Sequence, residues 1–134
     1  MGASEARAGV AAVEFALVAP IFIGLLLAIV VYGGWFWLAQ SVQSLASESA
    51  RAALGGLDEA EQRRLAEGFV TDQAGHVLGL DPRLATVTVT RDSQSLRVSI
   101  AYEVRDHPLI LLAGPLPKPP ATIARSAVVR TGGY

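Results

Sequence analysis

The chain has 134 residues, which allows one compact domain and an additional segment. Charged residues make up only 17% of it, below the roughly 25% of soluble domains, whereas hydrophobic residues make up 51%. A net charge of −1 argues against a nucleic-acid-binding protein, which needs a basic surface, and the absence of cysteine excludes disulfides, thiolate metal sites and cysteine nucleophiles.

The N-terminal part carries the excess of hydrophobic residues. After a short polar leader, residues 1–9, one long helix is expected from residue 10 to about residue 54. Residues 15–47 contain no charge, and their apolar part, residues 15–39, exceeds the ~20 residues that a helix needs to cross a bilayer. It also exceeds the roughly 7–15 apolar residues of a secretory signal peptide, whose basic beginning is missing here. The sequence therefore predicts a retained membrane-spanning helix.

Several side chains modify this helix. Pro20 removes a backbone hydrogen bond and is expected to kink it, which membrane helices tolerate. Tyr32, Trp35 and Trp37 lie near the end of the apolar run. Aromatic rings favour the headgroup level, so these three residues predict the membrane interface. The small and polar residues that follow, up to Arg51, predict a helical stem in water with a packing face of small side chains.

Two glycine pairs follow along the chain. The pair at residues 33–34 fits no spaced-glycine motif and predicts local flexibility, whereas the pair at residues 55–56 is expected to end the helix. Asp58 and Glu61 have the spacing of a capping box, so a second, amphipathic helix is expected over residues 59–78. Its predicted apolar face consists of Leu65, Phe69, Val70, Val77 and Leu78.

A small antiparallel sheet is predicted next. Two alternating segments around a polar turn at residues 92–95 predict a hairpin, and residues 122–130 predict a third strand, before a frayed tail. An apolar patch at residues 109–112, within the proline-rich loop 106–120, is expected to fold back onto the domain. The hairpin strands are expected at residues 86–90 and 96–105. The fold class is therefore α+β, with a small core that needs support from the stem or a partner.

Glu14 is the ionisable group at the start of the apolar run. It can simply mark where the helix meets the headgroups, since a carboxylate at the bilayer centre costs about 2.5–3.5 kcal/mol. A second interpretation starts from Gly9. If the chain is cut after Gly9, Val10 gains an α-amine on the same helical face as Glu14, four residues later. This cation can compensate the carboxylate of its own or of a neighbouring chain, and so fix the register of packed helices.

Gly9, four further residues and then Glu14-Phe15 ahead of an apolar helix resemble the type IV prepilin signature. The run AGVAAVEFALVAPIFIGLLLAIVVYG is similar to the N-terminus of the TadE-like family, the minor pseudopilins of Tad (Flp) pilus systems. The specific part of the resemblance covers residues 9–53. It implies cleavage between Gly9 and Val10 by a prepilin peptidase, with Glu14 and Phe15 serving peptidase recognition and assembly.

The resemblance also implies a place and a role. It implies a bacterial inner-membrane, single-pass protein whose C-terminal domain is extracytoplasmic, with a leader at residues 1–9, a helix and stem at 10–54 and a domain at 55–134. Its partners would be the prepilin peptidase, other minor pseudopilins and the assembly platform, and its function would be pilus assembly and adhesion. Two alternatives stay open: an unprocessed membrane-anchored interaction domain of the cell envelope, and a secreted domain released by signal peptidase.

No residue set in the sequence indicates catalysis. His76 and His107 lie far apart and without cysteine or clustered carboxylates, so no metal site is expected. The serines of the stem have no base in helical register. We therefore expect no enzyme, no metal, no cofactor, no small-molecule substrate and no nucleic-acid partner.

Overall fold

The computed structural model describes residues 2–131 and has the predicted α+β fold. A long apolar helix comes first, followed by a second helix and a three-stranded antiparallel sheet with the order β1-β2-β3. The elements are α1 (Gly2–Ala53), α2 (Glu59–Ala74), the 3₁₀ turn η1 (Pro82–Leu84), β1 (Ala85–Arg91), β2 (Ser95–Glu103), α3 (Pro108–Leu111) and β3 (Thr122–Arg130).

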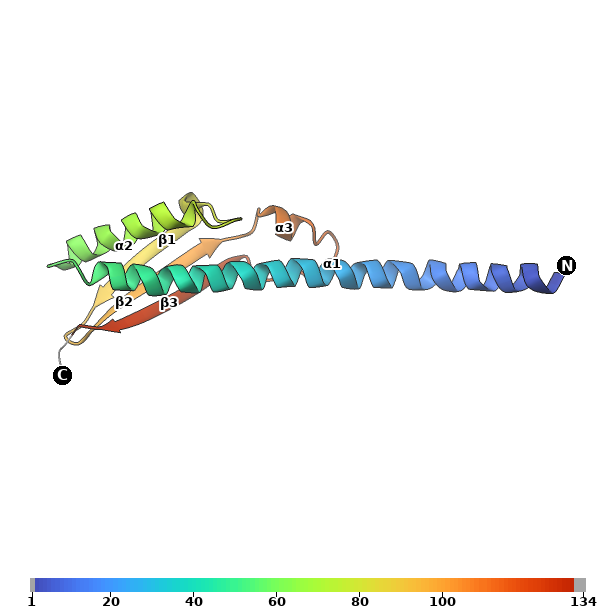
Figure 1. Cartoon of the computed structure of the whole chain (residues 1–134), viewed down its shortest axis with the longest axis horizontal. Helices are drawn as coiled ribbons and strands as arrows, with labels where there is room; N and C mark the ends of the chain where they lie inside the picture. Colours follow the sequence, from blue (N-terminus) through green and yellow to red (C-terminus); the bar gives the residue numbers. More distant parts are fainter. Residues whose placement is uncertain (1, 132–134) are drawn as a thin grey trace.

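The molecule is a rod with a domain built around one of its ends (Figure 1). The first half of α1 projects away from the domain, and its second half lies beside α2 against the sheet. Here α1 contacts β3 and β2, while α2 contacts β1. The second half of α1 and α2 therefore form one layer of helices that packs on one face of the sheet.

The predicted hairpin and third strand are confirmed. Strand β1 pairs with β2, and β2 with β3, both antiparallel, although β2 ends at Glu103, two residues before its predicted end. Alternation buries one face of the central strand, as a period of two requires. The buried side chains of β2 are Leu96, Val98, Ile100 and Tyr102. The predicted tail lies outside the described residues except for Thr131, whose N–H donates to the Gln94 carbonyl.

The polar turn between β1 and β2 is organised by Asp92. Its Oδ1 accepts from the backbone N–H of Gln94 at 2.7 Å and of Ser95 at 2.9 Å, and its Oδ2 accepts from the Ser95 hydroxyl at 2.8 Å. These hydrogen bonds favour the charged carboxylate and hold the pKa of Asp92 below its ordinary value. The hydrogen bond from the Gln94 N–H has the largest effect.

Small side chains on the stem let α2 approach closely. Ala46, Ala50 and Ala53 of α1 are fully buried, as are Ala66 and, nearly so, Ala74 of α2. Alanine leaves room for the two backbones to come together, so the predicted packing face of the stem is confirmed. Larger side chains of α1 fill the space over the sheet, and these are Leu38, Val42 and Leu45.

Helix α2 is shorter than predicted, and its buried face differs. It ends at Ala74 instead of residue 78, with Gly75 as its C-cap. Leu65 is 39% exposed and Leu78, in the following loop, is 88% exposed, so both were wrongly assigned to the apolar face. The reason is the alanine-rich stem, which accepts small side chains in place of leucines. The buried residues of α2 are Gln62, Ala66, Val70 and Ala74.

The end of α1 and the start of α2 agree with their sequence signals. Helix α1 ends at Ala53, before the predicted glycine pair. The Oδ1 of Asp58 accepts from the N–H of Glu61 at 2.7 Å, as expected for an N-cap. The Glu61 carboxylate accepts from the N–H of Leu57 at 2.8 Å, one residue before the N–H that a standard capping box uses.

Helix α1 begins at Gly2, earlier than the predicted start at residue 10. Residues 2–9 contain alanine, arginine and a glutamate in the first turn, all of which favour a helix, so the polar leader continues the rod. The helix passes through Pro20 without a break, and no bend is visible there in the view of Figure 1. The kink at Pro20 stays a prediction.

Candidate functional site

The exposed half of α1 is the candidate site. The first buried residue of this helix is Val31, and the large apolar side chains before it are about half to three-quarters exposed, except Leu27, which is half-buried. An 18-residue window of α1 has a mean hydropathy of 2.7 and is only 6% buried, so by length and composition this helix is able to cross a membrane. Residues 10–30 make about 31 Å of helix, which matches the ~30 Å hydrocarbon core of a bilayer.

Glu14 is the only charged side chain in residues 10–30. It is exposed and lines one shallow groove of the helix surface together with Arg7, Val10 and Ala11. Val10 and Glu14 therefore share a face, as the spacing predicts. Arg7 lies on the same face two turns before Glu14, so a cut after Gly9 would replace a distant guanidinium with an amine one turn away.

Gly9 and Phe15 lie on the same uncovered rod. A side chain at Gly9 would meet no atom within 4 Å, and Phe15 is 74% exposed. No described part of the domain covers either residue, so both are accessible to a partner. The Gly9–Val10 peptide bond lies within helical backbone, so a peptidase must unwind this turn to reach it.

The three aromatic residues predicted at the membrane interface divide into two groups. The Tyr32 hydroxyl donates to the Pro117 carbonyl at 3.0 Å, and the Trp35 indole Nε1 donates to the Pro120 carbonyl at 3.0 Å. These two residues hold the proline-rich loop against α1. Trp37 is 59% exposed and free to face headgroups. Phe36 beside it, which the sequence did not single out, is 64% exposed.

Gly34 provides close packing and not the predicted flexibility. A Cβ at this position would collide with the side chain of Leu109, whereas a Cβ at Gly33 would meet nothing within 4 Å. The absence of a side chain at Gly34 lets α3 lie directly on α1. The sequence offered no signal for this contact, because its two partners lie far apart along the chain.

The apolar patch at residues 109–112 folds back only in part. Leu109 packs on Gly34, and Ile110 is 3% exposed within the core. Leu111 and Leu112, in contrast, are 60% and 50% exposed. One side of this short helix therefore belongs to the domain, and the other side has no partner within residues 2–131.

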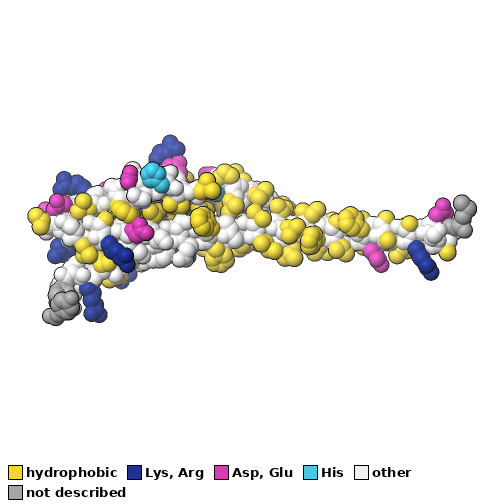
Figure 2. Space-filling view, viewed as in Figure 1, with side chains coloured by type: hydrophobic (Ala, Val, Ile, Leu, Met, Phe, Trp, Pro, Cys, Tyr) yellow, Lys and Arg dark blue, Asp and Glu magenta, His cyan; other side chains and the backbone are white. Residues whose placement is uncertain are grey.

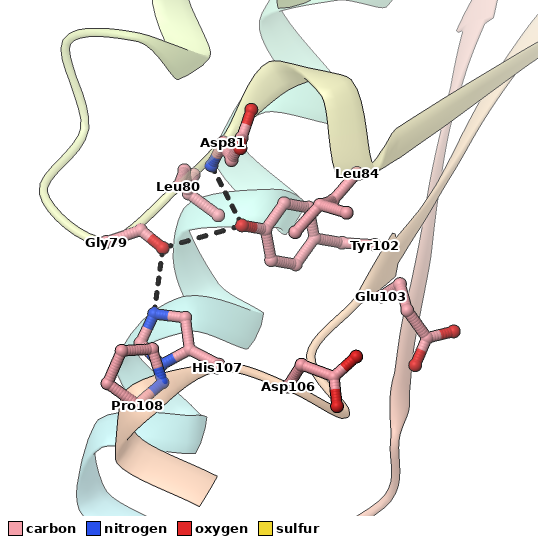
Figure 3. A pocket seen from close by; sticks show the side chains of 9 residues that line it. All are labelled: Gly79, Leu80, Asp81, Leu84, Tyr102, Glu103, Asp106, His107 and Pro108. Atoms are coloured by element: carbon pink, nitrogen blue, oxygen red, sulfur yellow. Dashed lines mark hydrogen bonds between the residues drawn. The ribbon is translucent and has the colours of Figure 1, made fainter. Parts of the chain in front are cut away.

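His107 is a structural residue (Figure 3). Its Nδ1 accepts from the N–H of Leu109 at 3.2 Å, so its Nε2 carries the proton and donates to the Gly79 carbonyl at 3.0 Å. The Tyr102 hydroxyl accepts from the N–H of Asp81 at 2.8 Å and ties down the same loop. Gly79 adopts φ +86°, which favours glycine. His76 is exposed and follows α2.

The pocket beside His107 shows no metal-binding arrangement. Asp81 lines it, but its carboxylate accepts from Arg83 at 2.9 Å, and this hydrogen bond lowers the pKa of Asp81. Within residues 2–131 no three His, Asp or Glu side chains are grouped so that they could hold a metal ion. The surroundings of His107 therefore stabilise the loops.

One comparison with known proteins matches the first part of the chain. The family model described as TadE-like protein matches residues 9–51. This segment begins at Gly9, contains Glu14 and the exposed apolar residues of α1, and ends two residues before α1 ends. A search of curated proteins and a search of solved structures gave no match. The sheet and α2 lie outside the matched segment.

Proposed function

Residues 9–51 are TadE-like, which associates the chain with Tad pili, and from this premise we propose that it is a minor pseudopilin processed by a prepilin peptidase. The peptidase cuts between Gly9 and Val10, and the mature helix enters the pilus or its initiating complex. The observation that supports this most is the rod of residues 10–30, which is apolar, exposed and of membrane length, and which carries one carboxylate a single turn after Val10.

The chemistry of assembly follows from that carboxylate. The α-amine of Val10 has an ordinary pKa near 7.7–8.0 and is largely protonated at neutral pH. In lipid, an unpaired charge is costly. The favoured arrangement of subunits is therefore the one that brings the amine of one subunit close to Glu14, either of its own chain or of the next. The subunit acts through packing and register and is not an enzyme.

The C-terminal domain is the part that other pilus proteins contact. We place it outside the inner membrane, with the leader in the cytoplasm. The second half of α1 belongs to the domain core, through residues such as Leu38 and Val42. A helix inserted into a pilus therefore carries its domain in a fixed position, where it can contact other minor pseudopilins and contribute to adhesion.

The mass of the protein isolated from its host envelope tests this function. Removal of residues 1–9 gives a chain that starts at Val10, and this start is the expected result. A mature start beyond residue 39 would indicate a secreted domain released by signal peptidase. A retained leader in cells with working pili would contradict the proposal.

An unprocessed membrane-anchored interaction domain is the second candidate. It is favoured by one observation: α1 runs as unbroken helix through the leader and Gly9, with no extended segment at the cleavage position. In this case Glu14 marks the headgroup level, and the leader remains on the protein. The mass measurement separates the two candidates directly.

A further inference from the structure

We propose that the loop of residues 108–120, named here the apolar loop, inserts into the surface of the bilayer that α1 spans and thereby anchors the domain to lipid. This inference rests on the membrane-spanning role proposed for α1. It assigns a lipid partner to a part of the domain that lies outside the TadE-like segment.

The position of the apolar loop relative to α1 is the first observation. The chain after α3 extends farther along α1 toward the N-terminus than any other part of the domain (Figure 1). Two hydrogen bonds fix it there, from Tyr32 to the Pro117 carbonyl and from Trp35 to the Pro120 carbonyl, each 3.0 Å long. If residues 10–30 span the bilayer, the loop has to lie at its surface.

The composition of the apolar loop is the second observation. Residues 108–117 read PLILLAGPLP and contain no polar or charged side chain. Lys118, the only lysine of the chain, follows directly and is exposed. An apolar segment followed by a lysine suits a bilayer surface, where the leucines enter the acyl region and the ammonium group stays among the phosphates.

The exposure of the apolar loop is the third observation. Leu111 is 60% and Leu112 50% exposed, although their neighbours Leu109 and Ile110 are used for packing. On the face shown in Figure 2, hydrophobic side chains lie along the exposed helix and also on the adjoining end of the domain. The apolar surface of the loop thus lies next to the surface that meets lipid, which favours lipid over a separate protein as its partner.

A single fluorescent probe tests the contact. The chain has no cysteine, so Leu112→Cys introduces one labelling site in the full-length protein. The labelled protein is reconstituted into vesicles of phosphatidylcholine and phosphatidylglycerol, with and without lipids that carry a nitroxide quencher at the headgroup. We expect the environment-sensitive probe at residue 112 to emit at shorter wavelength and to lose most of its emission to the quencher.

Two matched variants complete the experiment. Leu57→Cys places the same probe on an 89% exposed leucine in the turn after α1, at the far end of the domain, and its emission should stay that of a probe in water. Ile23→Cys places it on the exposed rod, where a nitroxide deep in the acyl chains should quench it.

The three probes separate the two proposals. Quenching at residue 23 together with water-like emission at residue 112 would overturn the lipid contact and leave the membrane-spanning helix intact. Water-like emission at residue 23 would overturn the spanning role itself. Equal quenching at residues 112 and 57 would show that the label alone drives binding and would also overturn the lipid contact.

Discussion

Glu14 has the largest proposed role of any single residue. Replacement by glutamine or alanine should leave cleavage after Gly9 intact and reduce the incorporation of the mature subunit. The α-amine of Val10 would then lie unpaired in lipid, and a cost of about 2.5–3.5 kcal/mol corresponds to a loss on the order of a hundredfold in an incorporation equilibrium. The measurement is the amount of mature subunit in sheared pili, relative to the amount in the membrane.

Glu5→Gln is the matched control for this substitution. Glu5 is an exposed glutamate of the same helix, but it lies in the leader and would leave with it. Pili in this variant should be unchanged. Normal incorporation of the Glu14→Ala subunit would rule out charge pairing as the basis of assembly and would return Glu14 to the role of a headgroup marker.

The residues of the candidate site differ in how well a sequence reveals them. Gly9, Val10 and Glu14 form a short local motif, and the common face of Val10 and Glu14 follows from helical periodicity alone. Gly34 and Tyr32 are different, because their partners Leu109 and Pro117 lie in a loop far along the chain. Contacts of this kind depend on how the domain docks on the stem, and no pattern within a window of residues carries that information.

The hairpin of β1 and β2 offers a prediction for pH. Asp92 has a lowered pKa in the folded protein because it accepts hydrogen bonds from Gln94 and Ser95. A lowered folded-state pKa contributes stability above the unfolded-state value of about 3.9, and this contribution is lost as the pH falls through the folded-state pKa. Asp92→Ala should therefore lower the urea midpoint of unfolding at neutral pH. The difference in midpoint between this variant and the parent protein should shrink below about pH 3.9.

Asp92→Asn is the comparison for the same turn. An amide oxygen can still accept from the two backbone N–H groups, but the charge is gone, so the pH-dependent part of the difference should resemble that of the alanine variant. At neutral pH, Asp92→Asn should lower the urea midpoint less than Asp92→Ala does. The urea midpoints of the parent and of Asp92→Ala could also differ by the same amount at all pH values. That result would show that the carboxylate contributes nothing to stability through its charge.

Among the elements, the strands follow their sequence pattern, and the predicted face of α2 is right at Val70, which is buried, but wrong at Leu65. Strand β3 has the bounds predicted for it, because alternating side chains require one buried face. In α2 the leucine at position 65 suggested the buried face, yet the helix buries Gln62 and Ala66, since it lies against the alanines of the stem. Periodicity predicts that a helix has a face, and the neighbouring element decides which residues form it.

At the scale of the whole molecule, α1 has two different environments. Its first half is a bare apolar rod, and its second half is part of the domain core, with the change at Val31. The sequence predicted both a membrane helix and a stem, but placed the end of the apolar part at residue 39. Trp35 and Leu38 are apolar because the domain packs on them, and an apolar side chain alone does not show whether lipid or protein surrounds it.

Fragments of the chain can separate these two environments. A fragment of residues 31–134 retains every buried residue of α1 and should fold in water, with cooperative thermal unfolding by circular dichroism. A fragment of residues 55–134 lacks the stem, and Leu38, Val42 and Leu45 alone contribute about 5–9 kcal/mol when fully buried. This loss is comparable with the ~5–15 kcal/mol by which whole domains are stable, so the shorter fragment should be unfolded or aggregated. Cooperative unfolding of the shorter fragment would mean that the sheet and α2 form a domain without the stem, and that α1 could change its position relative to that domain during assembly.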